Sequence, residues 1–366
     1  MFIRNKYKGK KVKKVEENGE LPWDVLDIIS KTLDFDDLFE FSGVSKNWRA
    51  FYKICRRNFL ASFLESQEPL LLQISYRDGG SFSFISIPNQ KVYCLKMMEH
   101  CFRYTYVTSS RGYLIMAGDI SNSFMLINLF TRMKKVISTP TFEVISSYLP
   151  ERALLAFGKC SEEFVLLILC EYRLHVYQSR NCGWVTYSTT RDAGRVVDFV
   201  VLHNIIYVVT NNANIGVLDL NYANIKFLKL KSTPDVPFSL YPRLVNCDEQ
   251  LLVVDSTCGE IRNVYKIDFS TMNYVKLETL GNIALFYVSN GFERNCYALN
   301  NPNLWGYERN SVYVIGILSA VCSVYSGDDK KLQKCITLPA LHGTSSHMYD
   351  WCFRHQQYEV DYSLVE

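Results

Sequence analysis

The feature that most constrains the fold is a hairpin pattern that returns along residues 69–366. In each copy, a short apolar run ends in a polar residue, and a tight turn leads to a second run that opens near Lys or Trp. The polar positions are Ser86, Asn128, Gln178, Asp219 and Asp268. They recur at roughly 40–50 residues, which is the length of a propeller blade. Further strands precede most copies, so we expect four strands per repeat and a β-propeller rather than a sandwich.

About six blades are expected. The last repeat is stretched by the insertion ERNCYALNNPNLWGYERN, and the C-terminal SHMYDWCFRHQQYEV either completes a blade or covers a sheet edge. The composition agrees with a β-rich body, since 24 Tyr and 22 Phe stand against only 18 Gly, and 48% of the residues are hydrophobic.

Residues 21–56 follow a different pattern, with apolar side chains spaced by three and four residues as in short helices. Pro22 suits the first turn of one helix, Asp36 or Asp37 can cap a second that ends at Gly43, and Ser45 caps a third. The apolar positions are Leu26, Ile29 and Leu33, then Leu38 and Phe41, then Val44, Trp48, Phe51 and Cys55. A unit of this size cannot bury all of these side chains by itself. We therefore expect a partner to cover some of them. The alternative is a helical hairpin packed on the following domain.

This helical stretch resembles the F-box motif. The matching positions are Leu21, Pro22, Leu26, Ile29, Leu33, Leu38, Val44, Trp48 and Arg49. The resemblance implies that these residues bind the Skp adaptor of a cullin-RING ubiquitin ligase. Three positions depart from the motif: Ser45 replaces a common Cys, Phe35 replaces a usual Pro, and Trp23 fills a variable position.

Residues 69–366 resemble the KIB-type β-propeller domain that follows the F-box in a large plant family. The segment DISNSFMLINLFT is similar to the Asn-Pro-Phe-Thr turn of that domain, with Leu129 in place of the usual Pro. Other similar segments are VVDFVVLHNIIYVV, QLLVV with VYKIDF, LGNIALFYVSN, NSVYVI and the terminal YDWCF. Together with the F-box, the resemblance covers nearly the whole chain.

Residues 1–20 are predicted to be a basic, disordered tail, and residues 57–68 a helical linker. The net charge of the chain is +3, and seven Lys and Arg residues precede the first acidic residue. The remainder of the chain therefore has a net charge of −4 and is not expected to bind nucleic acid. A nuclear-import signal or a weak nucleic-acid patch are the alternatives for the tail. The 12 scattered cysteines and the lack of a signal peptide predict reduced thiols and a location in the nucleus or cytoplasm. No apolar run is long enough to cross a membrane.

No catalytic, cofactor or metal motif stands out, so neither an enzyme nor a bound cofactor is expected. His347, Cys352 and His355 match no strong zinc spacing. A propeller glycosidase would need two carboxylates about 5–10 Å apart. The available carboxylates are Asp198, Asp219, Asp248, Asp255 and Asp268, and most of them lie at turn positions where Asp is favoured for local hydrogen bonds.

The sequence therefore predicts a non-catalytic substrate receptor of an SCF-type ubiquitin ligase, with an F-box for the adaptor and a propeller for a protein target. The alternatives are a propeller interaction module outside any ligase, or a propeller glycosidase. Target recognition is expected on the loops 181–195, 232–242 and 292–310. The third loop holds Arg294, Trp305, Tyr307 and Arg309, a mixture typical of binding hot spots. As an alternative, Trp305 would plug the channel or cover a blade edge.

Overall fold

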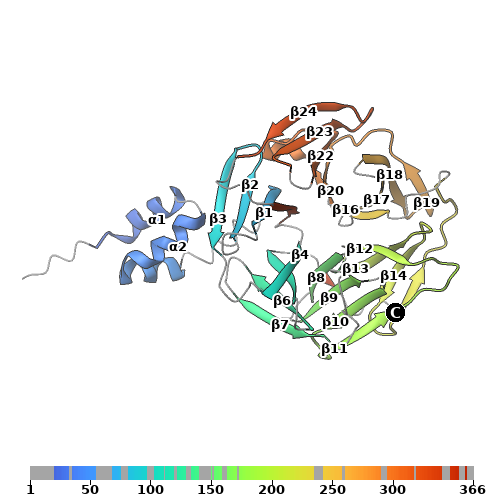
Figure 1. Cartoon of the computed structure of the whole chain (residues 1–366), viewed down its shortest axis with the longest axis horizontal. Helices are drawn as coiled ribbons and strands as arrows, with labels where there is room; N and C mark the ends of the chain where they lie inside the picture. Colours follow the sequence, from blue (N-terminus) through green and yellow to red (C-terminus); the bar gives the residue numbers. More distant parts are fainter. Residues whose placement is uncertain are drawn as a thin grey trace, which may run out of the picture. The chain divides into compact units, whose positions relative to one another are not determined.

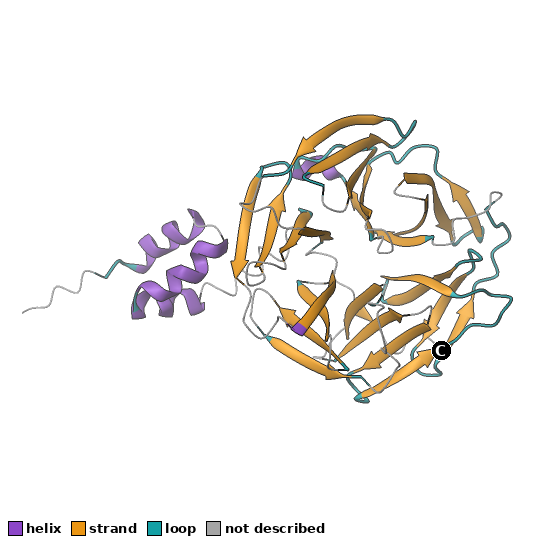
Figure 2. Cartoon of the chain, viewed as in Figure 1, coloured by secondary structure: helices purple, strands orange, loops and turns teal. Residues whose placement is uncertain are grey.

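A computed structural model describes most of the chain, which divides into two compact units, Met1–Phe59 and Leu60–Glu366. The described residues are 20–32, 35–54, 68–75, 81–96, 103–110, 112–118, 122–128, 133–139, 150, 152–158, 163–170, 173–234, 242–257, 260–289, 295–316, 319–339, 347–353 and 359–360. The predicted basic tail and helical linker lie almost wholly outside them. Figure 2 shows that the long helices belong to the first unit and the strands to the second.

The first unit, called the helical unit below, contains α1 (Trp23–Thr32), α2 (Phe35–Val44) and a third helical segment, residues 46–54. Ser45 caps the third segment as predicted, because the Trp48 N–H donates to its Oγ at 3.2 Å. The second helix begins at Phe35 and runs one residue past Gly43, so Asp36 and Asp37 lie inside its first turn and neither is the predicted cap. Because local spacing defines these helices, the sequence located them to within a residue or two.

The described strands of the second unit form six sheets, which Figure 1 shows arranged in a ring as the blades of a propeller. The first blade contains β25 (His347–Cys352), β1 (Leu70–Ser75), β2 (Ser81–Ser86) and β3 (Lys91–Lys96). The second contains β4 (Tyr104–Ser110), β5 (Tyr113–Gly118), β6 (Ser123–Asn128) and β7 (Lys134–Ser138). The third contains β8 (Arg152–Gly158), β9 (Phe164–Cys170), β10 (Arg173–Gln178) and β11 (Gly183–Tyr187), with β26 (Glu359–Val360) added beside β8.

The fourth blade contains β12 (Val196–Leu202), β13 (Ile205–Thr210), β14 (Ile215–Asp219) and β15 (Asn224–Phe227). The fifth contains β16 (Arg243–Cys247), β17 (Gln250–Thr257), β18 (Glu260–Asp268) and β19 (Asn273–Lys276). The sixth has the order β21 (Cys296–Asn300), β20 (Ile283–Ser289), β22 (Ser311–Gly316), β23 (Val321–Ser326) and β24 (Leu332–Thr337). The predicted six-bladed propeller is confirmed.

The C-terminal segment completes a blade, which decides between its two predicted roles. Strand β25 pairs antiparallel with β1, with Trp351 opposite Leu71, so the first blade is built from both ends of the described propeller. Such pairing joins the two ends of the propeller within one sheet, at a place called the seam below, and so closes the ring. Strand β26 then adds to the third blade in parallel with the end of β8.

One turn geometry recurs through the propeller and explains the repeated polar residue. Each of the five predicted polar residues is the last residue of the third strand of its blade. In the described turns, the residue four positions later has a left-handed φ, at Gln90, Cys182, Ala223, Met272 and Lys330. The last of these follows Ser326, so the sixth blade carries the same turn, which the sequence analysis missed.

The sixth blade departs from the others because the predicted insertion contains a strand. Strand β21 lies at the inner edge, antiparallel to β20, while β20 and β22 pair in parallel. The chain must therefore cross from β21 past β20 to reach β22. Residues 301–310 make this connection, called the crossover below, and include the 3-10 helix Pro302–Trp305.

The core consists of apolar side chains packed between neighbouring blades. The seven cysteines whose side chains the structure describes are free thiols. Cys247, Cys296, Cys322 and Cys352 are buried as predicted, whereas Cys182 and Cys335 are exposed. No helix within the described ranges is long and apolar enough to span a membrane.

Candidate functional site

The helical unit has a small core of its own. Leu26, Phe41 and Phe51 are buried, and Ile29 and Trp48 pack against them half-buried. The rings of Phe41 and Trp48 lie 4.4 Å apart between centroids. Leu26 is fully buried, so its predicted role in adaptor binding is corrected to that of a core residue that supports the surface. Leu33 and the side chain of Leu38 lie outside the described residues.

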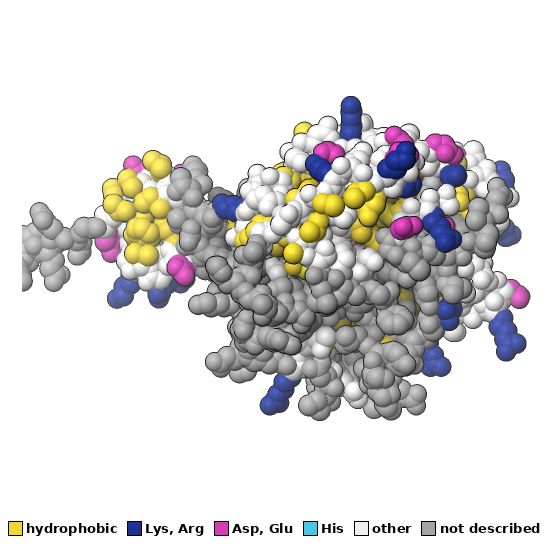
Figure 3. All heavy atoms as spheres, turned by 45° about the horizontal axis from the view of Figure 1, so that its top comes forward, with side chains coloured by type: hydrophobic (Ala, Val, Ile, Leu, Met, Phe, Trp, Pro, Cys, Tyr) yellow, Lys and Arg dark blue, Asp and Glu magenta, His cyan; other side chains and the backbone are white. Residues whose placement is uncertain are grey.

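Several large apolar side chains of the helical unit remain exposed. Figure 3 shows such side chains gathered on the face of the unit that it presents. Those with the largest exposed fractions are Leu21 at 37%, Trp23 at 47%, Ile28 at 65%, Val44 at 62% and Ile54 at 59%. Leu21 and Val44 belong to the predicted adaptor-binding set, and Pro22 and Arg49 from that set are exposed as well. A small unit with this much apolar surface is typical of a protein that binds a partner.

Trp23 and Asn47 hold the start of α1 against the third helical segment, and sequence reasoning assigned neither of them a role. The Trp23 indole N–H donates to Asn47 Oδ1 at 2.9 Å, and the Asn47 amide donates to the Leu21 carbonyl at 3.2 Å. Trp23 also packs edge-on against Phe51. The predicted adaptor-binding Arg49 donates from Nε to the carbonyl of Ser42, so it also ties the third segment to α2. These contacts fix the exposed residues in place.

On the propeller, the crossover holds three of the four predicted target-binding residues, and Arg294 lies outside the described part. Tyr307 is only 2% exposed, and its hydroxyl donates to the Pro69 carbonyl at 2.8 Å. Its predicted role in target binding is therefore wrong, because the ring is part of the core between the sixth and first blades. Trp305 is half-buried against the same core, in line with the alternative structural role. Arg309 is exposed.

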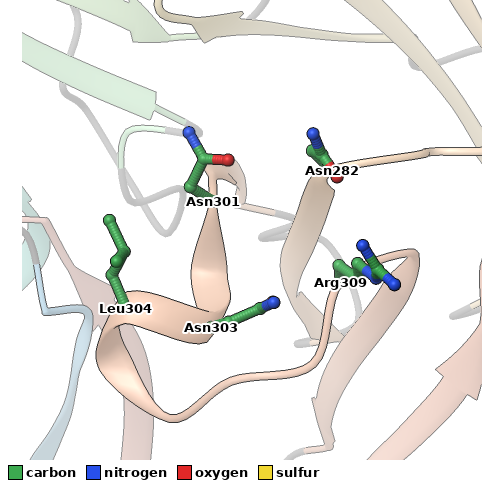
Figure 4. A pocket seen from close by; sticks show the side chains of 5 residues that line it. All are labelled: Asn282, Asn301, Asn303, Leu304 and Arg309. Carbon is green, nitrogen blue, oxygen red and sulfur yellow. The ribbon is translucent and has the colours of Figure 1, made fainter.

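A recess of about 160 Å³ lies between the crossover and the start of β20. Its lining residues are Asn282, Asn301, Asn303, Leu304 and Arg309, and Figure 4 shows them around the opening. A second, wider recess of about 350 Å³ shares Asn303 and Arg309 and extends to Gln333 on β24. The sequence pointed to Arg309 but not to the asparagines, which come together only through the pairing of β20 with β21.

The inner strands of the propeller carry a buried polar network rather than an open acidic site. Asp198 on β12 forms an ion pair with Arg152 on β8, and its Oδ2 accepts the Leu244 N–H at 2.9 Å. Asp350 on β25 accepts hydrogen bonds from Tyr106 at 2.7 Å and from Asn295 at 3.1 Å. Burial raises the pKa of the Asp350 carboxyl, and these hydrogen bonds act in the opposite direction.

The other carboxylates considered for glycoside hydrolysis have local roles or are buried. Asp219 and Asp268 each accept backbone N–H groups of their own turns, as predicted. Asp248 accepts the Asn300 amide at 2.6 Å, and Asp255 is buried on β17. Among the described residues, no three His, Cys, Asp or Glu side chains are grouped to hold a metal ion. His355 and the side chain of His347 lie outside that part, and Cys352 is buried in the core.

Comparison with known proteins identifies both units. Residues 19–59 match the model of the F-box domain, and residues 84–350 match that of the KIB1-4 β-propeller. Among solved structures, apo AztD from Citrobacter koseri is 12% identical over 60% of this chain and 59% of its own, with a TM-score of 0.35, so the match spans less than two thirds of AztD. A streptogramin B lyase is 13% identical over 65% of this chain and 83% of its own, with a TM-score of 0.35. No curated protein sequence matches. Because the propeller model covers most of the chain, this protein belongs to the KIB1-4 β-propeller family and carries an F-box domain before the propeller.

Proposed function

We propose that this protein is a substrate-receptor subunit of an SCF-type ubiquitin ligase, in which the F-box binds the Skp adaptor and the propeller binds a protein target. F-box domains generally bind Skp adaptors in SCF complexes. The observation that carries the proposal is the F-box unit itself, which matches the family model and exposes Leu21, Val44 and other large apolar side chains. These side chains would be buried on binding the adaptor.

The proposed subunit performs no chemistry and acts by proximity. Because one chain would hold both the adaptor and the target, a target lysine would meet the ubiquitin-loaded enzyme on the RING subunit at a raised effective concentration. The channel carboxylates support this assignment, since Asp198 and Asp350 are buried and hydrogen-bonded within the fold. We place the complex in the nucleus or the cytoplasm, in agreement with the free thiols of the described cysteines.

The adaptor contact is tested with variants of exposed residues, so that the fold of the F-box is left intact. Leu21→Asp and Val44→Asp each put a charge where an apolar contact is expected. Loss of an interface anchor commonly costs about 2 kcal/mol, so adaptor affinity should fall about 30-fold in each variant. The affinity of the purified full chain for the Skp adaptor is measured by calorimetry, and the melting temperature should stay unchanged. Trp48→Ala is a poorer probe, because Trp48 packs on Phe41 inside the unit.

The matched control is Val136→Asp, which makes the same change at a 48% exposed valine on β7 of the propeller. This variant should bind the adaptor as the wild type does. If the wild-type chain does not bind the adaptor, the ligase assignment is wrong and a propeller module outside any ligase takes its place. If it binds the adaptor and neither F-box variant weakens binding, Leu21 and Val44 are not part of the adaptor contact.

A further inference from the structure

The crossover is held rigidly, so the smaller recess on it is present before any ligand arrives. The Asn301 N–H donates to the Asn282 carbonyl at 2.9 Å, which fixes the start of the crossover beside the residue that precedes β20. At its other end, the Asn310 N–H donates to the Ile283 carbonyl at 2.9 Å and the Gly327 N–H to the Asn310 carbonyl at 2.7 Å. Tyr307 anchors the middle of the segment through its bond to Pro69. A preformed site loses little conformational entropy on binding.

The left-handed backbone of Asn301 shapes the opening of this recess. Its φ of 49° and ψ of 51° turn the chain sharply from β21 into the 3-10 helix, and asparagine tolerates this conformation better than most residues. The turn brings the side chains of Asn301 and Asn303 to the same opening as Asn282. Within the described residues, none of these three side-chain amides has a hydrogen-bond partner, so each has donors and an acceptor available.

Arg309 supplies a positive charge at this opening that its neighbours do not neutralise. The adjacent acid, Glu308, forms an ion pair with Lys334 on β24 and is therefore occupied. In the part of the chain that the structure describes, the Arg309 guanidinium has no such partner. Leu304, which lines the same recess, is 76% exposed and offers an apolar contact beside the charge.

We infer that this recess binds an acidic peptide segment of the target. The guanidinium of Arg309 takes a side-chain carboxylate, the amides of Asn282, Asn301 and Asn303 hydrogen-bond the peptide groups on either side, and Leu304 packs against an apolar neighbour of the acidic residue. A volume of about 160 Å³ holds about five water molecules, which suits one side chain and its flanking peptide groups. The inference rests on the proposed receptor function, because it names the class of segment that the propeller recognises.

The test uses the full chain and two acetylated, amidated pentapeptides, Ala-Leu-Glu-Leu-Ala and its counterpart with glutamine in place of glutamate. Binding is followed by the methyl NMR signal of Leu304, assigned with Leu304→Met. The glutamate peptide should shift this signal with saturation at millimolar concentration. The glutamine peptide should bind at least about tenfold more weakly, because a hydrogen bond between charged groups is lost. Arg309→Gln should weaken the glutamate peptide by the same factor.

Arg262→Gln is the matched control, since Arg262 is exposed on β18 and does not line the recess. It should leave binding unchanged. Equal binding of the two peptides, or equal effects of the two arginine variants, would overturn the acidic-peptide assignment. Adaptor affinity, measured on the same samples, separates the two proposals: a chain that binds adaptor but not peptide contradicts only this inference, whereas one that binds peptide but not adaptor contradicts only the ligase function.

Discussion

A charged or titratable side chain is buried in this propeller where a neighbouring strand supplies a partner. Asp198 meets Arg152 across two blades, and Asp350 receives the Tyr106 hydroxyl. His175 on β10 is only 6% exposed, and its Nδ1 lies 2.9 Å from the Thr186 hydroxyl. Burial, together with the positive charge of Arg173, lowers the pKa of His175 to about 4. A buried neutral histidine of this kind makes stability depend on pH.

The sign of that dependence follows from the two pKa values. In the unfolded chain His175 titrates near 6.5, so between about pH 6.5 and 4 the unfolded state binds a proton that the folded state does not. The His175 contribution therefore destabilises the fold as the pH falls, by about 2 kcal/mol at pH 5, since each pKa unit corresponds to about 1.4 kcal/mol. His175→Gln removes this proton, so its stability relative to the wild type should improve between pH 7 and pH 5, measured by chemical denaturation.

The difference in stability between His175→Gln and the wild type at pH 7 serves as the reference for the difference at pH 5. A constant difference between His175→Gln and the wild type would contradict the expected titration.

At the scale of elements, the sequence predicted what local spacing determines. Ser45 caps its helix, and three of the polar residues that end third strands, Ser86, Asp219 and Asp268, accept hydrogen bonds from their own turns. Strand β21 and the crossover could not be predicted in the same way. The innermost position of β21 depends on its antiparallel pairing with β20. The parallel pairing of β20 with β22 depends on contacts around an inserted segment.

The same limit applies to the candidate sites. An aromatic and arginine-rich loop indicates a binding surface, but the sequence does not reveal which ring faces the core. In the structure Tyr307 lies between two blades while Arg309 faces solvent. In the F-box, spacing identified Leu26 and Val44 as equal members of one set, yet one is buried in the unit and the other is 62% exposed.

The crossover is expected to stabilise the contact between the sixth and first blades through Tyr307. Tyr307→Phe keeps the ring but removes the hydroxyl, leaving the buried Pro69 carbonyl without this donor. Loss of one partner of a buried hydrogen bond costs about 1–3 kcal/mol, so denaturant titration should show a lower stability by this amount. Tyr222→Phe, at a 73% exposed tyrosine in the turn between β14 and β15, should be neutral. Equal stability of both variants and the wild type would show that the Tyr307 hydroxyl does not stabilise this contact.

At the scale of the whole propeller, all six blades meet in one buried polar network. Its members come from the inner strands and the residue before β21. They are Tyr106, Arg152, Asp198, Arg243, Asn295, Tyr297 and Asp350. Outside the ring, exposed lysines such as Lys91, Lys134 and Lys276 lie on outermost strands, where charge discourages pairing with other chains. The inner strands of the six blades are therefore joined by buried polar contacts, and the outermost strands carry exposed charge.

The contact between the first and sixth blades at the seam depends on Trp351 of β25. Trp351 is fully buried, and its ring lies 4.8 Å from that of Phe286 in the sixth blade, while its backbone pairs with Leu71 of the first. Trp351→Ala should cost about 3–5 kcal/mol, because a buried aromatic leaves a cavity when it is truncated.

Since both neighbouring blades lose contacts together, the propeller of this variant should still unfold in one transition at a lower midpoint, measured by fluorescence and circular dichroism on the same sample. Leu332→Ala, at a 53% exposed leucine on the outermost strand β24, removes an apolar side chain away from the seam and should change stability little. If Trp351→Ala costs less than about 1 kcal/mol, or if the two signals separate into distinct transitions, then the seam does not couple the blades and the ring is held by contacts within each sheet.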